Sequence, residues 1–502
     1  MMNLLGHRRQ SALETAVEPL LLTTAGYLSL NRRRTALLAI AVLLATGGGS
    51  WLVLRYGLIP PLVLLTSLLL AAIFWQPRLG VYVLFALVLL FEAGGPDDLM
   101  LPGRYLNFGL QSSFGVSGFI ASPLELLLLF SFGSWAIQGI ARRNLRFRMG
   151  SLAWPLVLFY LALLGGIVRG TLAGGDAYIA FWEARALLYV LLCYLVASNT
   201  IENTRHVTIL TGITLLAVGA FAIEGAYRHI VLVNTVLSGI PEELVYTHDT
   251  VIFLGTELFL VLALWIYRSP AWQRLLGLAL APVTLFTLLA TQRRAGYIAL
   301  LVALLALALV LAVTHRKAFG IVILPLLIGT SIYLPIFWNN TGLLGQPARA
   351  VRSLSQPDAR DASSNEYRAL EKVNVIETIH SDPLLGVGFG REFHFVVPLP
   401  SLSWWEFWHY EPHHNIMWVW LKTGAPGFIA FWILMCSTVA YAAAAIRTSP
   451  HPSVKIFGVL ALVGIIQTLV FCYVDLGLVD GRVTVFLGTL MGTVGILRDI
   501  QA

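Results

Sequence analysis

The sequence predicts an all-α membrane protein, a polytopic bundle of about 12 to 14 transmembrane helices with a long external loop. Of its 502 residues, 58% are hydrophobic and only 12% are charged, whereas a soluble globular protein carries about 25% charged residues. Apolar runs of roughly the 20 residues that span a bilayer recur along the chain. One long polar stretch, residues 338–414, interrupts them.

Candidate membrane helices follow from the apolar runs. They comprise residues 35–54, 57–75, 80–94, 116–140, 151–168, 186–200, 206–225, 249–267, 275–291, 296–314, 319–337, 415–445, 455–474 and 483–498. The first two are interrupted by glycines at 47–49 and prolines at 60–61, which weaken helices. The expected organisation is a cytoplasmic tail (1–34), a transmembrane bundle (35–337), an external, partly helical loop (338–414) and C-terminal transmembrane helices (415–502).

Basic residues gather in alternate short loops. If the amino terminus is cytoplasmic, the inner loops carry the basic residues of 32–34, Arg78, 142–148, Arg205, 268–274, 315–317, 447–455 and Arg498. This distribution satisfies the positive-inside rule and places both termini in the cytoplasm. Membrane topology therefore explains the net charge of +7, and nucleic-acid binding is not expected.

Arginines at the outer ends of helices oppose the same rule and need another explanation. Arg293 and Arg294 are adjacent in a short turn between two apolar segments, and Arg185 opens another segment. A guanidinium group can bond two phosphate oxygens at once, so the adjacent pair predicts an anion site. For Arg185, an interfacial side chain paired with Glu183 is an equally good interpretation.

Aromatic, imidazole and carboxylate side chains are mixed between Trp404 and Asn415. His414 leads directly into an apolar segment, and a histidine in this place can accept a proton near neutral pH. A hydrogen-bonded interfacial histidine is the alternative. The spacing of the histidines and Glu411 fits no standard metal-ligand pattern, so neither a metal nor another cofactor is expected.

The run Gly386-Val387-Gly388-Phe389-Gly390 is expected to form a tight turn. A dinucleotide-binding loop would need a preceding strand and a following helix, and neither is predicted here. The tryptophans at 404, 405 and 408 are expected to form an interfacial aromatic belt or to stack on sugar rings.

At these residues the sequence resembles the O-antigen ligase and Wzy-type polymerase superfamily. His414-Asn415, followed by Gly424-Ala425-Pro426-Gly427, is similar to the family's His-Asn…Gly-x-x-Gly signature. Eight residues separate Asn415 from the first glycine, where the family usually has nine. For this reason His413 is the alternative to His414 as the family's histidine.

The resemblance extends over about residues 180–445. Residues 382–390 are similar to the family's PLLGVGxG loop, and the segment from Asn365 to Arg368 precedes it. Arg294 resembles the arginine that opens a mid-chain helix in the family, and Arg185 resembles an earlier arginine.

The resemblance implies an all-helical glycosyltransferase of the GT-C type in the bacterial inner membrane, with its active site on the outer face. Such an enzyme moves an oligo- or polysaccharide from undecaprenyl diphosphate to an acceptor hydroxyl, without a metal. The acceptor is a lipid A-core, another lipid-linked glycan, a protein or a wall polymer. A single displacement implies inversion at the anomeric carbon.

The resemblance also implies roles for particular residues. His414 is expected to be the general base, and Arg185, Arg293 and Arg294 are expected to hold the diphosphate and stabilise the departing charge. Further candidates for substrate binding are Arg368, Asn415 and His413.

Three other functions compete with the ligase interpretation. A Wzy-type polymerase would use the same donor, and the sequence does not separate it from a ligase. An anion transporter is a second alternative, since some members of the superfamily have been linked to bicarbonate uptake. Transport requires charged groups at mid-membrane depth, and Glu257 and Glu224 form no evident relay. A purely structural protein would leave the outer arginines and the long loop unexplained.

Overall fold

The computed structural model describes residues 59–92, 122–143, 147–233, 246–402 and 405–500. The chain forms two compact units, residues 1–72 and 73–502. In the first unit the described residues belong to helix α2 (Ile59–Trp75). The expected cytoplasmic tail (1–34), the membrane segment 35–54 and Trp404 lie outside the described residues.

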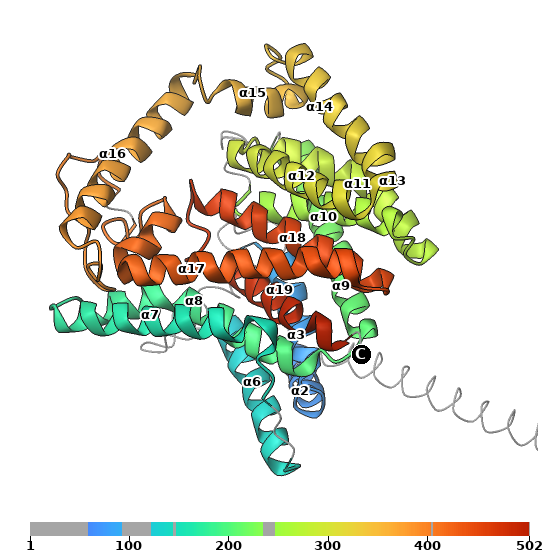
Figure 1. The fold of residues 1–502 in the computed structure, drawn as a ribbon, viewed down its shortest axis with the longest axis horizontal. Helices are drawn as coiled ribbons and strands as arrows, with labels where there is room; N and C mark the ends of the chain where they lie inside the picture. Colours follow the sequence, from blue (N-terminus) through green and yellow to red (C-terminus); the bar gives the residue numbers. More distant parts are fainter. Residues whose placement is uncertain (1–58, 93–121, 144–146, 234–245, 403–404, 501–502) are drawn as a thin grey trace, which may run out of the picture. The chain divides into compact units, whose positions relative to one another are not determined.

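Every regular element in the described ranges is a helix (Figure 1). The helices after α2 are α3 (Arg78–Leu90), α6 (Pro123–Ala141), η1 (Gly150–Leu152), α7 (Ala153–Leu172), α8 (Ala177–Thr200), α9 (Thr204–Tyr227), η2 (Arg228–Leu232), α10 (Thr250–Ile266), α11 (Ala271–Ala290), α12 (Arg294–Thr314), α13 (Arg316–Ala318), η4 (Phe319–Ile323), α14 (Leu324–Ile336), η5 (Leu343–Gly345), α15 (Gln346–Arg352), α16 (Ala359–Ser381), α17 (Asn415–Thr448), α18 (Pro452–Cys472) and α19 (Gly481–Ile500). Within these ranges, ten helical spans have the length and apolar composition to cross a membrane, and three shorter helices are also apolar. The prediction of an all-α polytopic membrane protein is thereby confirmed.

Several helix starts, those of α8 and α11 among them, differ from the predicted boundaries. Helix α8 begins at Ala177, because the side chain of Asp176 accepts backbone N–H groups of the following turn at 2.7 and 3.1 Å. Arg185 therefore lies more than two turns inside α8 and does not open it. The helical span predicted at 319–337 begins at Arg316 and contains the π-helical stretch η4 before α14.

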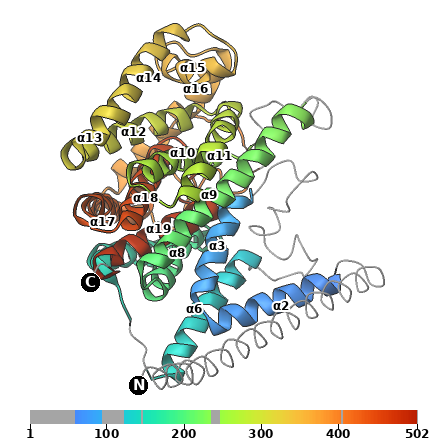
Figure 2. The same cartoon turned by 90° about the vertical axis from the view of Figure 1, so that its right-hand side faces the viewer.

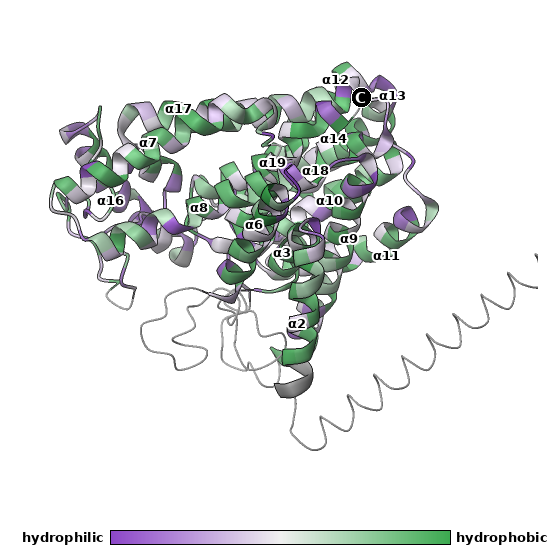
Figure 3. Ribbon diagram, turned by 90° about the horizontal axis from the view of Figure 1, so that it is seen from below, coloured by the Kyte–Doolittle hydropathy of each residue, from purple (hydrophilic) through white to green (hydrophobic). Residues whose placement is uncertain are grey.

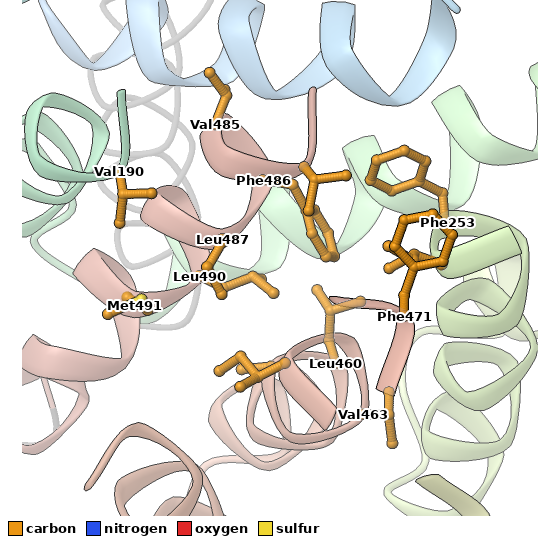
Figure 4. Close-up of a cluster of buried hydrophobic side chains, with 14 of the residues drawn as sticks. Val190, Phe253, Leu460, Val463, Phe471, Val485, Phe486, Leu487, Leu490 and Met491 are labelled. Carbon is orange, nitrogen blue, oxygen red and sulfur yellow. The ribbon is translucent and has the colours of Figure 1, made fainter. Parts of the chain in front are cut away.

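Helices α18 and α19 form the buried centre of the second unit, because 78% and 83% of the residues in the 18-residue apolar stretch of each are buried. Phe486 of α19 stacks on Phe85 of α3 with 5.8 Å between ring centroids. It also meets Phe253 of α10 edge-on at 5.2 Å (Figure 4). Gly488 and Gly492 let α19 approach the backbone of α8, where added side chains would collide. This close packing fixes the helix ends that surround the centre.

Short connections make neighbouring helices antiparallel, so that alternate helix ends gather at one face of the bundle. Helices α10, α12, α17 and α19 begin at this face, and α11 and α18 end there. We call it the site face. Helices α7 and α17 lie side by side and are mostly hydrophobic, whereas α16 carries many hydrophilic residues (Figure 3). Helices α14 and α15 come after α12 in the chain, and α15 contacts both α14 and α12 (Figure 2).

Candidate functional site

Helix α16 carries a polar stripe toward the bundle. Its members are Asp361, Asn365, Arg368 and Lys372. Spacings of four, three and four residues place these side chains on one face of a helix. The contacts that follow connect this stripe to the starts of α12 and α17 and to the turn between α18 and α19.

Arg294, the first residue of α12, is held at the N-terminal end of the stripe. Its Nε lies 3.3 Å from Oδ1 of Asp361, and its Nη2 donates to Oδ1 of Asn365 at 3.2 Å. Its Nη1 donates to the hydroxyl of Ser353 at 3.3 Å. Arg294 and Arg368 also lie within electrostatic range of each other. The structure thus brings Arg294 to Asn365, which lies 71 positions later in the sequence, and to Arg368.

Arg368 lies in the middle of the stripe and faces the turn between α18 and α19. Its Nη2 is 3.6 Å from Oδ2 of Asp475, and Nδ1 of His248 lies 2.9 Å from the same oxygen. Among the described residues, no acceptor reaches the buried Nε of Arg368. Burial opposes ionisation of Asp475, but His248, Arg368 and His413 outweigh burial and hold the pKa of this carboxyl well below its usual range.

His413 forms a pair with Glu371 at the C-terminal part of the stripe. Nδ1 of His413 lies 3.0 Å from Oε1 of Glu371, and the backbone N–H of His413 donates to Oε2 at 2.9 Å. The rings of Tyr367 and Trp405 meet the imidazole edge-on, with centroids at 5.6 and 6.3 Å. Two bonds from one buried carboxylate therefore fix both the position and the orientation of this histidine.

His414 has a different environment from its neighbour. Its Nδ1 accepts the backbone N–H of Met417 at 3.3 Å and thereby caps α17. Its ring lies against Tyr473, with ring centroids 4.4 Å apart. Burial, and next the charge of Lys372, lower the pKa of His414 to about 4. The imidazole is therefore neutral near pH 7, with its proton on Nε2.

Asn415 is buried and has a structural role in this arrangement. Its Oδ1 accepts the backbone N–H of Leu478 at 2.8 Å, and its Nδ2 donates to the carbonyl of Pro412 at 3.1 Å. These bonds tie the start of α17 to the turn between α18 and α19. The side chain thereby positions the histidines before it.

We refer to the residues joined by these contacts as the α16 cluster. It consists of His248, Arg294, Asp361, Asn365, Arg368, Glu371, Lys372, His413, His414, Tyr473 and Asp475. Lys372 belongs to it through its ammonium group, which lies 6.0 Å from the ring centroid of Tyr473.

Arg185 is outside the α16 cluster among the described residues. Its guanidinium makes a two-point ion pair with Glu125 of α6 and lies over the ring of Trp182, 4.1 Å from the centroid. Tyr189 donates to the same carboxylate at 2.5 Å. Glu183, the expected partner of Arg185, instead pairs with the buried Lys422 at 2.7 Å. The structure therefore favours a packing role for Arg185 between α6 and α8.

Arg293 has a supporting role next to Arg294. It precedes α12 as its N-cap residue, and its Nη2 donates to the carbonyl of Tyr246 at 3.3 Å. Tyr246 opens the short segment that contains His248. Arg293 thus links the start of α12 to the segment before α10.

The glycine run at 386–390 forms a tight turn that joins α7, α8 and α17. Backbone bonds connect Val387 to the carbonyl of Leu421 at 2.8 Å and Phe389 to that of Gly166 at 3.2 Å. The backbone N–H of Gly390 donates to the Glu183 carboxylate at 2.6 Å. Together with the bond from the N–H of Gly386 to the carbonyl of Asp382, these contacts engage four of the five N–H groups of the run, which favours a structural connection over a phosphate loop.

A large apolar cavity lies beside the start of α12. It has a volume of about 1510 Å³ and is bounded by α10, α11, α12 and the α13–α14 span. Tyr297, one turn after Arg294, and Val351 of α15 line one end, whereas Arg268 and Lys317 line the other. Only 6% of the residues in the α13–α14 span are buried. The cavity therefore offers an apolar surface that leads to Arg294.

Six members of the α16 cluster were missed by reasoning from the sequence. They are His248, Asp361, Glu371, Lys372, Tyr473 and Asp475. The polar spacing along 361–372 was a usable signal for the residues of α16. No local pattern connects His248 with Asp475, which are separated by 227 positions.

A known protein family matches the segment that contains most residues of the α16 cluster. Residues 278–432 match a family model described as O-antigen ligase, and no curated protein matches the chain. The matched segment includes Arg294, α16 and both histidines at the start of α17. This family implies a glycan-processing transferase or ligase that uses a lipid-linked glycan donor and a glycan acceptor. In this multi-pass membrane protein, residues 278–432 are therefore similar to the O-antigen ligase family.

Proposed function

We propose that this protein is an inverting, O-antigen ligase-type glycosyltransferase of the GT-C type. It transfers an oligo- or polysaccharide from undecaprenyl diphosphate to an acceptor hydroxyl. The main support for the proposal is the polar stripe of α16. Arg294, Arg368 and the Glu371–His413 pair follow one another along this stripe. The arginines suit a diphosphate and the imidazole suits a hydroxyl proton, and the proposed reaction needs both.

His413 is the proposed general base, in place of His414. With Glu371 accepting from Nδ1 of His413, the proton of the neutral ring lies on that nitrogen, and the lone pair of Nε2 accepts the hydroxyl proton. In His414 the lone pair of Nδ1 receives the N–H of Met417, and Nε2 carries the proton. To act as a base, His414 would have to break its helix cap.

The reaction is a direct displacement at the anomeric carbon. The acceptor oxygen forms a bond to this carbon as its proton moves to Nε2 of His413. The bond from the carbon to the diphosphate oxygen breaks, and the electron pair leaves with the diphosphate. Arg294 and Arg368 stabilise the developing negative charge, which is the contribution that fixed cations make most effectively in a partly buried site. The acceptor approaches opposite to the departing diphosphate, so the configuration inverts.

The apolar cavity supports a lipid-linked donor. A polyprenyl chain in the cavity would run past Tyr297 and bring its diphosphate to Arg294. Burial of apolar chain carbons stabilises binding by about 0.8 kcal/mol per methylene group. The lipid and the diphosphate are therefore recognised by adjoining surfaces of α12.

The distribution of basic residues supports the orientation of the reaction. Arg78, Arg205, Arg447 and Arg498 lie at helix ends opposite to the site face. By the positive-inside rule these ends belong in the cytoplasm. The proposed location is the bacterial inner membrane, with both termini cytoplasmic and the α16 cluster on the outer face.

Release of undecaprenyl diphosphate tests the proposed function. The purified full chain in liposomes receives a lipid-diphosphate glycan and, in separate reactions, a lipid A-core acceptor or a second lipid-linked glycan. Product on the lipid A-core supports a ligase, and elongation of the second glycan indicates a polymerase. His413→Gln is expected to abolish release, whereas His380→Gln on the exposed face of α16 retains it. No release by the wild-type chain with either acceptor would contradict glycosyl transfer.

A further inference from the structure

A short segment before α10 presents one exposed histidine at the site face. In the run from Tyr246 to Thr250, His248 is the exposed residue, with 46% of its side chain accessible, and both ends of the run are buried. Each neighbour of His248 has its side chain turned into the protein. The segment therefore displays this imidazole on a fixed backbone.

Buried hydrogen bonds hold the segment on both sides of His248. The N–H and hydroxyl of Thr247 donate to Oε1 of Glu92 at 2.8 and 3.0 Å, and the hydroxyl of Thr250 donates to the same oxygen at 2.6 Å. The carboxylate of Asp249 accepts a hydrogen bond from Nη1 of the buried Arg482 at 2.7 Å. Such support is the kind that holds a functional side chain within a narrow range of positions.

The imidazole itself is oriented by Asp475. This carboxylate lies 2.9 Å from Nδ1 of His248 and 3.6 Å from Nη2 of Arg368, and it is within electrostatic range of His413. Because Nδ1 is engaged by the carboxylate, the second ring nitrogen, Nε2, is the one directed away from Asp475. At the start of the segment, the carbonyl of Tyr246 accepts a hydrogen bond from Nη2 of Arg293.

We propose that His248 is a further catalytic residue, which binds the diphosphate of the lipid donor through Nε2–H. This inference rests on the proposed function, and it assigns a role to a residue outside the segment that matches the family. His248 belongs to the segment before α10, whereas Arg294 and Arg368 belong to α12 and α16. Three donors from three elements would then surround one diphosphate.

The two histidine–carboxylate pairs of the cluster then have opposite tasks. His413 receives the proton of the acceptor hydroxyl, and its partner Glu371 stabilises the resulting imidazolium. His248 keeps its proton and donates a hydrogen bond to the diphosphate oxygen that receives the electron pair of the broken bond. This role uses the imidazolium form of His248, in which Nδ1–H donates to Asp475 and Nε2–H donates to the diphosphate. A charge-assisted bond to this oxygen strengthens as the bond to the anomeric carbon breaks.

Binding of inorganic pyrophosphate tests this role independently of glycosyl transfer. Calorimetric titration of the full chain in detergent compares wild type with His248→Gln and with Asp475→Asn. His248→Gln is expected to weaken pyrophosphate binding by about 10- to 100-fold, because one charge-assisted hydrogen bond is lost. Asp475→Asn is expected to weaken it less, and the double variant is expected to be no weaker than His248→Gln alone.

A histidine–carboxylate pair outside the α16 cluster provides the matched control. His380 lies 3.7 Å from Glu377 on the exposed side of α16, with 68% of its side chain accessible. His380→Gln should leave pyrophosphate binding unchanged. In the release assay, His248→Gln should lower kcat and leave the KM for the acceptor unchanged, because the bond strengthens toward the transition state.

The outcomes separate this inference from the proposed function. If wild type and His248→Gln bind pyrophosphate equally, or if wild type does not bind it, His248 is not a diphosphate ligand. A rise in the acceptor KM with unchanged pyrophosphate binding would also overturn the assignment. If pyrophosphate binding depends on His248 but no lipid-linked glycan yields product, the anion site stands and glycosyl transfer fails.

Discussion

The carboxylate of Glu371 bonds to His413 at two points, with Oε1 3.0 Å from Nδ1 and Oε2 2.9 Å from the backbone nitrogen. A single side chain thus sets the position of the residue and the direction of its ring. The adjacent His414 turns its own Nδ1 to the first turn of α17. Nδ1 is engaged in both neighbouring histidines, but Nε2 carries a lone pair in His413 and a proton in His414.

The first prediction concerns the general base. His413→Gln is expected to lower glycosyl transfer by about 100- to 10,000-fold, the usual contribution of a positioned base. Glu371→Gln retains the shape but removes the charge that stabilises the imidazolium, and it should lower the rate by about 10- to 100-fold. Release of undecaprenyl diphosphate under single-turnover conditions measures both. Equal activity of His413→Gln and wild type would exclude His413 as the base.

The second prediction concerns His414 and the stability of α17 at low pH. Its pKa in the folded chain, about 4, is below the ordinary value of 6.5. Between these values the unfolded chain binds more protons, so the stability due to the neutral imidazole is present above pH 6.5 and is lost as the pH falls toward 4. His414→Asn retains a capping side chain and removes this titration. Its Tm should therefore fall less than that of the wild type between pH 6.5 and 4.5.

Thermal unfolding in detergent measures this effect. Near pH 7, His414→Asn should keep more than a tenth of the wild-type glycosyl transfer activity, because the base is at the neighbouring position. His414→Ala provides the comparison without a cap and should lose about 1 kcal/mol of stability. An activity loss in His414→Asn as large as that in His413→Gln would contradict the division of roles.

The third prediction concerns recognition of the diphosphate by Arg294. Its three nitrogen atoms contact Asp361, Asn365 and Ser353 in a planar arrangement that an ammonium group does not reproduce. Arg294→Lys is therefore expected to lower kcat/KM for the lipid donor by about 10-fold or more. Arg293→Lys, one residue earlier, should have a smaller effect, because Arg293 donates to the carbonyl of Tyr246, an acceptor that a lysine can also bond. Steady-state kinetics at varied donor concentration distinguish the two.

The fourth prediction concerns Gly424, where α17 departs from helical geometry with φ of 67°. Residues that have a Cβ rarely adopt this φ. At this position a Cβ would also collide with the backbone of Leu384 and Leu385. Gly424→Ala is expected to cost at least about 2 kcal/mol. It should also loosen the turn at 386–390. Unfolding temperature and limited proteolysis at this turn report both effects.

Gly165→Ala is the matched control for that substitution. Gly165 lies in α7, has no neighbouring atom near the position of an added Cβ, and does not share the unusual φ of Gly424. Alanine favours a helix by about 1 kcal/mol relative to glycine, so Gly165→Ala should not lower stability. A Gly424→Ala variant as stable as the wild type would show that the turn does not depend on this contact.

The fifth prediction concerns the apolar cavity beside α12. Leu304 is buried and lines it, whereas the neighbouring Leu305 is exposed and does not. Leu304→Trp is expected to raise the KM for a donor with a long polyprenyl chain by several-fold, because the larger ring takes space from the lipid. A donor with a short chain should be less affected, and Leu305→Trp should affect neither. Equal effects on both donors would exclude the cavity as the lipid site.

The sequence by itself determined the helical class and the main apolar segments, and it led to the prediction of site residues at Arg294 and the start of α17. These features depend on local composition, on charges at helix ends and on short spacings, and each can be recognised within one stretch of chain. The expected helix starts at 296 and 415 agree with Arg294 and Asn415 within two residues. Arg185 was placed less well, because its two preceding helical turns are rich in aromatic residues and lack a simple apolar pattern.

Only the tertiary structure decided which groups share a site. It turned Arg185 to Glu125, brought the polar stripe of α16 to Arg294, and joined His248 to Asp475 across 227 positions. It also distinguished His413 from His414, since the difference depends on whether Nδ1 donates to a carboxylate or accepts a backbone N–H. Hydropathy is a property of a segment, whereas an ion pair or hydrogen bond between distant residues exists only when the packed helices hold both partners within about 3 Å.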